Sequence, residues 1–242
     1  GLERGSSLGV VGGSGSGKTT LCLSVMRLLP KNAVVESGRI LLDGVDLLSL
    51  SEEEMRSVRG KRVSMIFQNP HTSLNPTATV EEHLLEIYEL KLGMGAGEAK
   101  QSAREVLREA GIDHPQDVLN KYPHQLSGGL AQRVLIALAI AQSPEVLIAD
   151  EPTSALDAVA TLRITNLLKK LCDRRGMSLV MVSHDLRTVL GLVDEVVVML
   201  SGQVVERAPA DRLLERPLHP YTKLLVRAYR DVFWRGAAVR NR

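Results

Sequence analysis

The sequence predicts an α/β fold in which a mostly parallel sheet is covered by helices on both faces, with an all-helical segment inserted near the middle. Short, mostly apolar runs at Leu8–Val11, Val146–Ala149 and Ser178–Val182 are typical of strands buried on both faces. Helical patterns alternate with these runs, and this alternation is typical of parallel βαβ units. About residues 78–140 show helical patterns and no strand pattern, which indicates the insertion.

Turn and helix-stop residues divide the rest of the chain into elements. Pro30 and Pro144 each end a helical pattern, because proline has no N–H to continue the hydrogen bonding. The pairs Asp43-Gly44 and Ser201-Gly202 are typical of tight turns. Further strands are expected at Arg39–Leu42, Arg62–Phe67, Glu195–Leu200 and Gln203–Glu206. Helices are expected at Lys18–Leu29, Val80–Leu92, Glu98–Ala110, Leu130–Gln142, Ala158–Cys172 and from Tyr221 onward.

Length and composition bound the organisation of the chain. We expect the 242 residues to form one domain, with a core at about 1–77 and 141–210, a helical subdomain at about 78–140 and a C-terminal helical extension at about 211–242. The formal charge is +2 and basic residues alternate with acidic ones, so no nucleic-acid partner is expected. No apolar run approaches the roughly 20 residues that span a bilayer, so a membrane would be reached through another protein.

The end of the chain is the exception to this even charge distribution. From Arg227 onward it carries five Arg and one acidic residue. We expect a solvated, frayed terminus there, with contact to acidic lipid or a partner as the alternative.

A glycine-rich loop directly follows the first predicted strand and opens the first predicted helix. It fits the pattern G-x-x-x-x-G-K-[ST] in the context that this pattern requires for phosphate binding. Its glycines let successive N–H groups point inward at phosphate oxygens, and the helix N-terminus adds partial positive charge. We expect Lys18 to reach the β- and γ-phosphates of ATP and Thr19 to supply a hydroxyl to Mg²⁺. The loop consists of Gly12, Gly13, Ser14, Gly15, Ser16, Gly17, Lys18, Thr19 and Thr20.

Polar side chains stand at the ends of three further predicted strands. The carboxyl ends of parallel strands line the ligand crevice of a sheet. We therefore expect Asp150 to hold Mg²⁺, directly or through water, and Glu151 to act as the general base on the attacking water. His184 is expected to contact the γ-phosphate, and Gln68 to orient water or complete the Mg²⁺ coordination. For His184 and Gln68 a structural role is the alternative.

A short segment before the helix at Leu130–Gln142 resembles the LSGGQ signature of ABC ATPases. It consists of Leu126, Ser127, Gly128, Gly129 and Leu130. The order of phosphate loop, Gln68, signature, acidic pair, Asp157 and His184 matches that family over nearly the whole chain. The resemblance implies a P-loop NTPase with a RecA-like core and a head-to-tail dimer of two nucleotide-binding domains. ATP bound at one Lys18 would be completed by Ser127 and Gly129 of the other domain, and Asp157 would connect the two sites.

Two further segments resemble the dipeptide, oligopeptide and nickel importers within this family. They are Gln68–Pro76 and His219–Leu225. The resemblance implies an ATP-hydrolysing motor subunit that acts on transmembrane permease subunits through the segment after Gln68. It would lie peripherally on the cytoplasmic face of the inner membrane, with a periplasmic or extracellular solute-binding protein as an indirect partner. For His219–Leu225 a proline-capped helix start is a second interpretation, and both can hold together.

The sequence departs from the family pattern at two places. Leu130 replaces the Gln of the signature; because members of this subgroup tolerate an apolar residue there, we expect an active site. The family has further strands upstream, including an aromatic residue that stacks on adenine, and we expect these to be missing from the chain. The alternative function is a non-transport ABC ATPase subunit of a soluble multiprotein assembly. Glu151 and His184 favour catalysis in either case.

Overall fold

Six strands form the main sheet of the computed structural model, which describes residues 1–239 with the side chains of residues 232–239 excepted. Their order across the sheet is β4-β5-β6-β1-β7-β8. Neighbouring strands pair in parallel except β8, which runs antiparallel to β7. The predicted mostly parallel sheet is therefore confirmed. The strands are β1 Ser7–Gly12, β4 Val63–Ile66, β5 Val146–Asp150, β6 Ser178–Ser183, β7 Glu195–Leu200 and β8 Gln203–Pro209.

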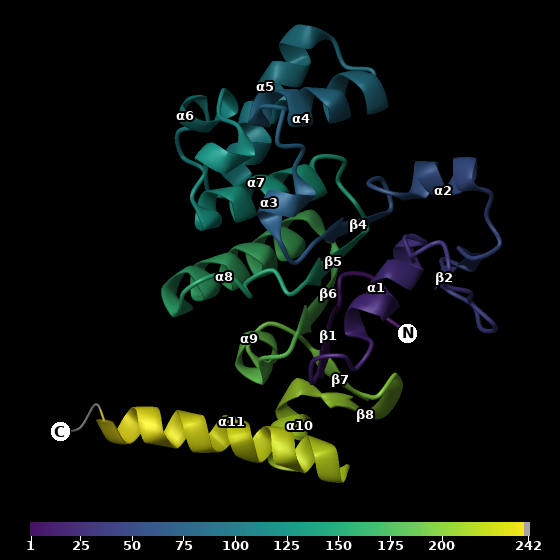
Figure 1. The fold of residues 1–242 in the computed structure, drawn as a ribbon, viewed down its shortest axis with the longest axis vertical. Helices are drawn as coiled ribbons and strands as arrows, with labels where there is room; N and C mark the ends of the chain where they lie inside the picture. The colour runs from purple at the N-terminus through teal and green to yellow at the C-terminus, as the bar shows by residue number, and fades with distance from the viewer. Residues whose placement is uncertain (240–242) are drawn as a thin grey trace.

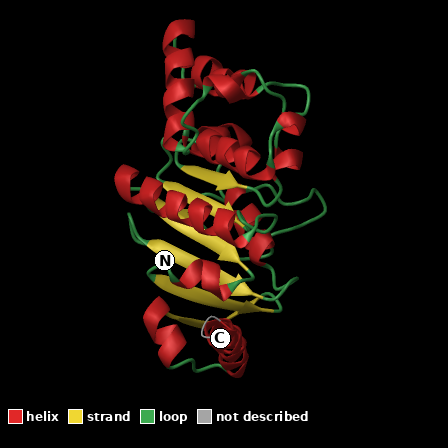
Figure 2. Cartoon of the chain, turned by 90° about the vertical axis from the view of Figure 1, so that its left-hand side faces the viewer, coloured by secondary structure: helices red, strands yellow, loops and turns green. Residues whose placement is uncertain are grey.

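Helices cover both faces of this sheet (Figure 1), because alternate strand residues enter two separate apolar cores. Figure 2 shows the helices of one face in front of the strands. On one face, Val10 of β1 packs in a core with Cys22 and Met26 of α1 (Lys18–Met26). On the other face, the next residue, Val11, packs in the larger core. Several helices contribute to this larger core, among them α7 (Gly128–Ile140), α8 (Ala158–Arg175) and α9 (Leu186–Leu190). The coverage of both faces agrees with the prediction.

Helical segments extend the molecule beyond both edge strands (Figure 1). The described segment between β4 and β5 contains only helical elements, and α7 contacts α5 as well as β4 and α8, so it joins this segment to the sheet. These elements are α3 Pro70–Ser73, α4 Val80–Leu85, the π-helical turn η1 Glu86–Lys91, α5 Ala96–Glu109, α6 Gln116–Leu119, the 3₁₀ turn η2 Pro123–Gln125 and α7. Beyond β8 lie α10 Ala210–Glu215 and α11 Pro220–Val239.

Several predicted boundaries are wrong for local reasons. The helix expected to reach Leu29 ends at Met26, because Arg27 adopts a left-handed backbone with φ of 51°. The strand expected at Arg39–Leu42 is reduced to β2 (Leu41–Leu42), which pairs with β3 (Val45–Asp46) around the predicted Asp43-Gly44 turn. The helix expected at Val80–Leu92 changes to π-helical hydrogen bonding at Glu86. Helix α2 (Glu52–Val58), which begins with a Ser51–Glu54 capping box, was not predicted.

The chain end is more regular than expected. Helix α11 continues to Val239, so the expectation of a frayed terminus from Arg227 is wrong up to that residue. Arg240 and Arg242 lie outside the described residues. Among the helices that the structure describes, none combines the length and apolar character needed to cross a membrane.

Candidate active site

The phosphate loop connects β1 to α1 in a conformation that depends on its glycines. Gly15 and Gly17 have φ of 75° and 95°, a left-handed region that other residues enter at a cost of about 1–2 kcal/mol. A Cβ on Gly12 would lie 2.3 Å from the carbonyl oxygen of Met199 on β7. The loop therefore needs glycine both for its backbone and for its close approach to the neighbouring strand.

Lys18 lies inside the loop with only 7% of its surface exposed. Its Nζ donates hydrogen bonds to the carbonyl oxygens of Gly12 at 3.0 Å and Gly13 at 2.9 Å. The ammonium group is thus held at the start of the loop, where it can meet phosphate oxygens that bind to the inward-facing N–H groups.

Asp150 ends β5 as a buried carboxylate beside the start of α1. It is 2% exposed, and among the described residues its Oδ1 has no hydrogen-bond partner. Burial raises the pKa of Asp150 above its usual range and the nearby Glu151 carboxylate adds to this, while the Thr19 hydroxyl and the Lys18 ammonium oppose it. A buried carboxylate oxygen that lacks a donor fits the role of a cation ligand.

Thr19 and Asp150 together provide the oxygen ligands that Mg²⁺ prefers. Mg²⁺ is commonly bound by one or two protein groups and completed by substrate phosphates and water. Within the described residues, no group of three or more His, Cys, Asp or Glu side chains is placed to hold a metal ion. These two side chains therefore fit Mg²⁺ whose remaining ligands are substrate phosphates and water.

Asp150→Asn is expected to raise the melting temperature of the nucleotide-free protein at neutral pH by about 2–4 °C. The reason is that the neutral Asn side chain avoids the free-energy cost of burying a charge, here roughly 1 kcal/mol. The folded state raises the pKa of Asp150, so it binds this proton more tightly than the unfolded chain. The contribution of Asp150 to stability therefore falls as pH rises through the raised pKa. The gain from Asn should disappear at acidic pH, where the carboxyl group is protonated. Thermal unfolding at neutral and acidic pH checks this.

Asp194→Asn is the matched control for this substitution. The hydroxyl and the N–H of Ser7 donate to the Asp194 carboxylate at 2.7 and 2.8 Å and lower its pKa. The same change is therefore expected to lower the melting temperature at neutral pH. A lower melting temperature for Asp150→Asn as well would contradict the proposed cost of burying its charge.

Glu151 and His184 come from neighbouring strands and are in direct contact. The Glu151 carboxylate accepts the N–H of His184 at 2.8 Å, and its two oxygens lie 2.9 and 2.8 Å from His184 Nδ1. The Glu151 side chain is 10% exposed, whereas that of His184 is 62% exposed. Glu151 has φ of 49°, a strained backbone for a residue other than glycine. The structure thus brings together two of the four residues that were expected at strand ends.

Gln68 and the signature segment lie apart from the phosphate loop and line a cavity of their own. A cavity of about 610 Å³ is lined by Gln68, Gly128 of α7 and the segment that follows Glu151, including Ser154. Gln68 is exposed and follows the edge strand β4, which is separated from β1 by β5 and β6. The structure places Gln68 beside the signature segment.

The signature segment is open toward solvent. Leu126 is buried, but Ser127 and Gly128 are exposed. Ser127 stands at the start of α7, and its side chain does not cap the helix. A Cβ on Gly129 would meet nothing within 4 Å of its position. These groups are therefore available to a ligand presented from outside this chain.

Asp157 has a structural role that the sequence analysis did not identify. Its Oδ1 accepts the N–H groups of Val159 and Ala160, both at 2.9 Å, and so caps α8. The side chain is exposed, which leaves its second oxygen accessible from the surface.

Two contacts to the phosphate loop were not predicted from the sequence. The N–H of Gly13 donates to the hydroxyl of Tyr221 in α11 at 2.8 Å. The N–H of Gly202, in the β7–β8 turn, donates to the carbonyl of Ser16 at 3.0 Å. The sequence singled out both segments, as an importer-like motif and as a turn, but nothing in their spacing indicated contact with the loop.

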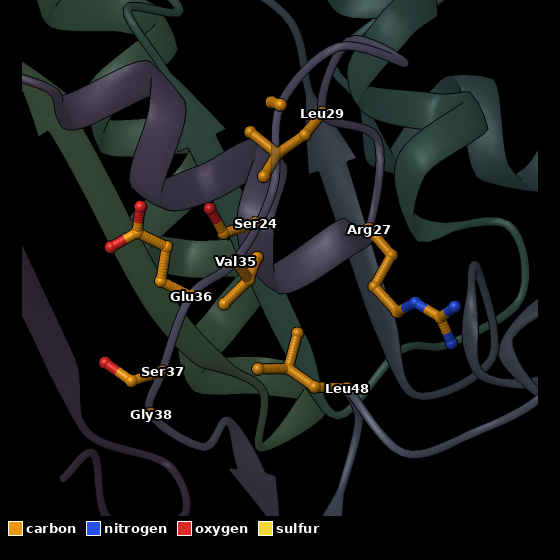
Figure 3. Close-up of a pocket in the computed structure, with 9 residues that line it drawn as sticks. Ser24, Arg27, Leu29, Val35, Glu36, Ser37, Gly38 and Leu48 are labelled. Carbon is orange, nitrogen blue, oxygen red and sulfur yellow. The ribbon is translucent and has the colours of Figure 1, made fainter.

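A separate cavity of about 410 Å³ lies at the far end of α1 from the phosphate loop (Figure 3). Ser24 and Arg27 line it from α1 and its C-terminal cap, and Val35 and Glu36 line it from the following loop. None of the residues that the sequence analysis assigned to nucleotide or Mg²⁺ lines this cavity.

Comparison with known proteins agrees with this geometry. A family model described as ABC transporter matches residues 1–154, and a model described as the C-terminal region of oligopeptide/dipeptide transporters matches residues 205–236. The chain is 45% identical over 231 residues to a probable peptide ABC transporter ATP-binding protein of Sinorhizobium fredii, covering 95% of this chain and 69% of the relative. It is 42% identical over 226 residues to an oligopeptide transport ATP-binding protein of Bacillus subtilis, covering 93% and 69%.

A solved structure leads to the same family. A dimeric ATP-binding cassette in a post-hydrolysis state, bound to ADP and Pi, superposes with a TM-score of 0.74 at 30% identity, covering 87% of this chain and 88% of that chain. The phosphate loop, the buried strand-end carboxylate and the signature segment agree with this similarity. The chain therefore belongs to the ABC transporter family, as an ATP-binding subunit.

Proposed function

We propose that this chain hydrolyses ATP and acts as the motor subunit of a peptide importer. The observation that carries the proposal is the contact between Glu151 and His184 at the sheet edge that also holds Asp150 and the phosphate loop. A subunit that only bound nucleotide would not need a strained, nearly buried carboxylate beside an imidazole at this position.

The residues of this edge have separate parts in the proposed reaction. Lys18 binds the β- and γ-phosphates, while Thr19 and Asp150 hold Mg²⁺, which when bound neutralises charge on those phosphates. A Glu151 carboxylate oxygen takes a proton from the attacking water. His184 orients Glu151 through the observed hydrogen bonds and contacts the γ-phosphate. Gln68 completes the site only if nucleotide binding moves it toward the loop.

The proposed working form is a dimer in which each signature segment completes the partner's nucleotide site. The exposed Ser127 and the open space at Gly129 support this arrangement, and the similar cassette bound to ADP and Pi is dimeric. Asp157 would communicate between the two sites from the N-cap of α8. The partner is a second nucleotide-binding domain, identical or related.

The remaining partners follow from the importer assignment. The segment after Gln68 would dock transmembrane permease subunits, with the chain lying peripherally on the cytoplasmic face of the inner membrane. A solute-binding protein outside that membrane would deliver the cargo. The relatives named above are peptide and oligopeptide transport proteins, which favours peptides over nickel as the cargo class.

Gly129→Asp is expected to lower ATP turnover by about 10²-fold while leaving ATP binding to the isolated chain unchanged. The new side chain meets open space within this chain, so folding should not suffer. In the dimer its charge would face the partner's phosphates. Steady-state turnover, calorimetric ATP titration and thermal unfolding check this.

Gly97→Asp in the first turn of α5 is the matched control, since a side chain there also meets open space. It should behave like the parent chain. Parental turnover in Gly129→Asp would argue against completion of the site by a partner. Copurification with a permease pair, together with peptide uptake by reconstituted vesicles, separates the importer from a soluble ABC assembly.

A further inference from the structure

The C-terminal extension contacts the phosphate loop through the hydroxyl group of Tyr221. Tyr221, in the first turn of α11, accepts the N–H of Gly13 at 2.8 Å, although the two residues are 208 positions apart in the chain. A Cβ on Gly13 would lie 3.2 Å from this hydroxyl oxygen, so the ring sits close against the loop backbone. The contact is exposed, yet it fixes a glycine, the residue type with the greatest backbone freedom.

Gly13 links this hydroxyl to the phosphate-binding lysine. Its N–H donates to Tyr221, and its carbonyl oxygen accepts from Lys18 Nζ at 2.9 Å and from the N–H of Ser16 at 3.2 Å. A rotation of the backbone at Gly13 would therefore move an acceptor of Lys18. A partner that fixes the Gly13 N–H therefore also fixes the position of the Lys18 ammonium group before phosphate binds.

The backbone that carries Tyr221 is anchored by a buried carboxylate. Glu206 on β8 is 9% exposed and accepts the N–H groups of Leu218 and His219, both at 2.8 Å. His219 Nδ1 in turn accepts the N–H of Tyr221 at 3.2 Å. Thr222, the next residue, is fully buried. Charge-assisted hydrogen bonds of this kind hold a segment rigidly, so the hydroxyl is presented to the loop by the scaffold.

The same C-terminal unit touches the loop at a second point. Strand β8 begins after the β7–β8 turn, whose Gly202 N–H donates to the Ser16 carbonyl at 3.0 Å. Strand β8 contains Glu206, and the chain then continues to α10 and α11. Two backbone groups of the phosphate loop, at Gly13 and Ser16, are therefore held by one continuous segment that follows β7.

We propose that Tyr221 is a positioning residue of the nucleotide site, whose hydroxyl fixes Gly13 and so prearranges the phosphate loop and Lys18 for binding. The inference rests on the proposed function insofar as this loop binds ATP. A flexible loop loses conformational entropy when it closes around phosphates, and a loop that is already ordered loses less. Because the hydroxyl does not touch reacting atoms, it acts on affinity and not on the chemical step.

The test is Tyr221→Phe, which keeps the ring and removes only the hydroxyl. The dissociation constants of ATP and ADP are expected to rise about 3- to 10-fold, the range for loss of one net hydrogen bond. KM for ATP should rise by a similar factor while kcat stays within about twofold. The control is Tyr229→Phe, which removes a hydroxyl from the same helix two turns further on and should bind like the parent. All measurements are made below the unfolding temperature of each variant.

A double-mutant cycle tests whether the effect passes through Gly13. The φ of Gly13 is not in the left-handed region, so alanine can adopt its backbone, but the new methyl group presses on the Tyr221 hydroxyl. Gly13→Ala should therefore weaken ATP binding more in the parent than in Tyr221→Phe, with an expected difference of about threefold. Equal effects in the two backgrounds would overturn the inference.

The remaining outcomes separate this inference from the proposed function. If the parent binds no nucleotide, the proposed function fails. If the parent binds ATP and Tyr221→Phe binds it equally well, only the inference fails. A fall in kcat with unchanged KM would also overturn it, because a positioning role in binding does not change the chemical step alone.

Discussion

Glu151→Gln is expected to lower ATP turnover by about 10²–10⁴-fold while ATP affinity is retained. The substitution keeps the size of the side chain and one oxygen that can accept the backbone N–H of His184. In the parent chain this N–H lies 2.8 Å from the Glu151 carboxylate oxygen. It removes the carboxylate that takes a proton from water. Because ATP would bind and not be cleaved, the dimer should accumulate. Phosphate release, ATP titration and size-exclusion chromatography with ATP and Mg²⁺ measure the three effects.

Glu145→Gln is the matched control for this prediction. Glu145 lies next to the opposite end of β5 and pairs with Arg62 at 2.7 Å, away from the phosphate loop. Its replacement removes a surface ion pair of roughly 0–1 kcal/mol and should leave turnover unchanged. If Glu151→Gln hydrolysed ATP at the parental rate, the general-base assignment would be wrong.

Lys18→Ala is expected to weaken ATP binding by about 10–10²-fold, the equivalent of one charge-assisted hydrogen-bond group worth roughly 1.5–3 kcal/mol. Lys18 is 7% exposed and its ammonium group is held by two loop carbonyls, so its charge is fixed inside the loop. Its loss removes both an attraction for phosphate and a cross-link within the loop. Isothermal titration calorimetry measures the change in affinity.

Lys31→Ala provides the comparison for this variant. Lys31 is an exposed lysine beyond the C-terminal end of α1, so its removal makes the same change in net charge outside the loop. Its ATP affinity should equal that of the parent. An unchanged affinity in Lys18→Ala would show that this loop does not bind the nucleotide through its lysine.

Local patterns in the sequence were sufficient to predict most strands of the sheet and the polar residues at their carboxyl ends. The strand ending in Asp150 and Glu151 and the loop ending in Lys18 follow from short apolar runs and glycine spacing, which act over a few residues. The contact between Glu151 and His184 was not predicted; it forms because the parallel strands β5 and β6 are neighbours in the sheet and bring their carboxyl ends together.

What the sequence did not predict depends on chain paths or on single backbone angles. The end of α1 at Met26 depends on one left-handed residue, Arg27, which no residue preference indicates. The bond between Tyr221 and Gly13 depends on how β8 and two helices return to the loop. Strand β8 also continues to Pro209, beyond the predicted end at Glu206, because Arg207, Ala208 and Pro209 pair with β7.

The left-handed backbone at Glu151 bears on how a subunit of this kind would lose its activity during evolution. A single base change in a glutamate codon can give glycine, alanine, valine, lysine, glutamine or aspartate. At φ of 49° glycine relieves strain, whereas β-branched valine adds to it. As far as backbone strain is concerned, mutational drift away from hydrolysis would therefore favour glycine at position 151. A glycine there, with the phosphate loop intact, would mark a degenerate copy that had given up the carboxylate and released the strain of its backbone.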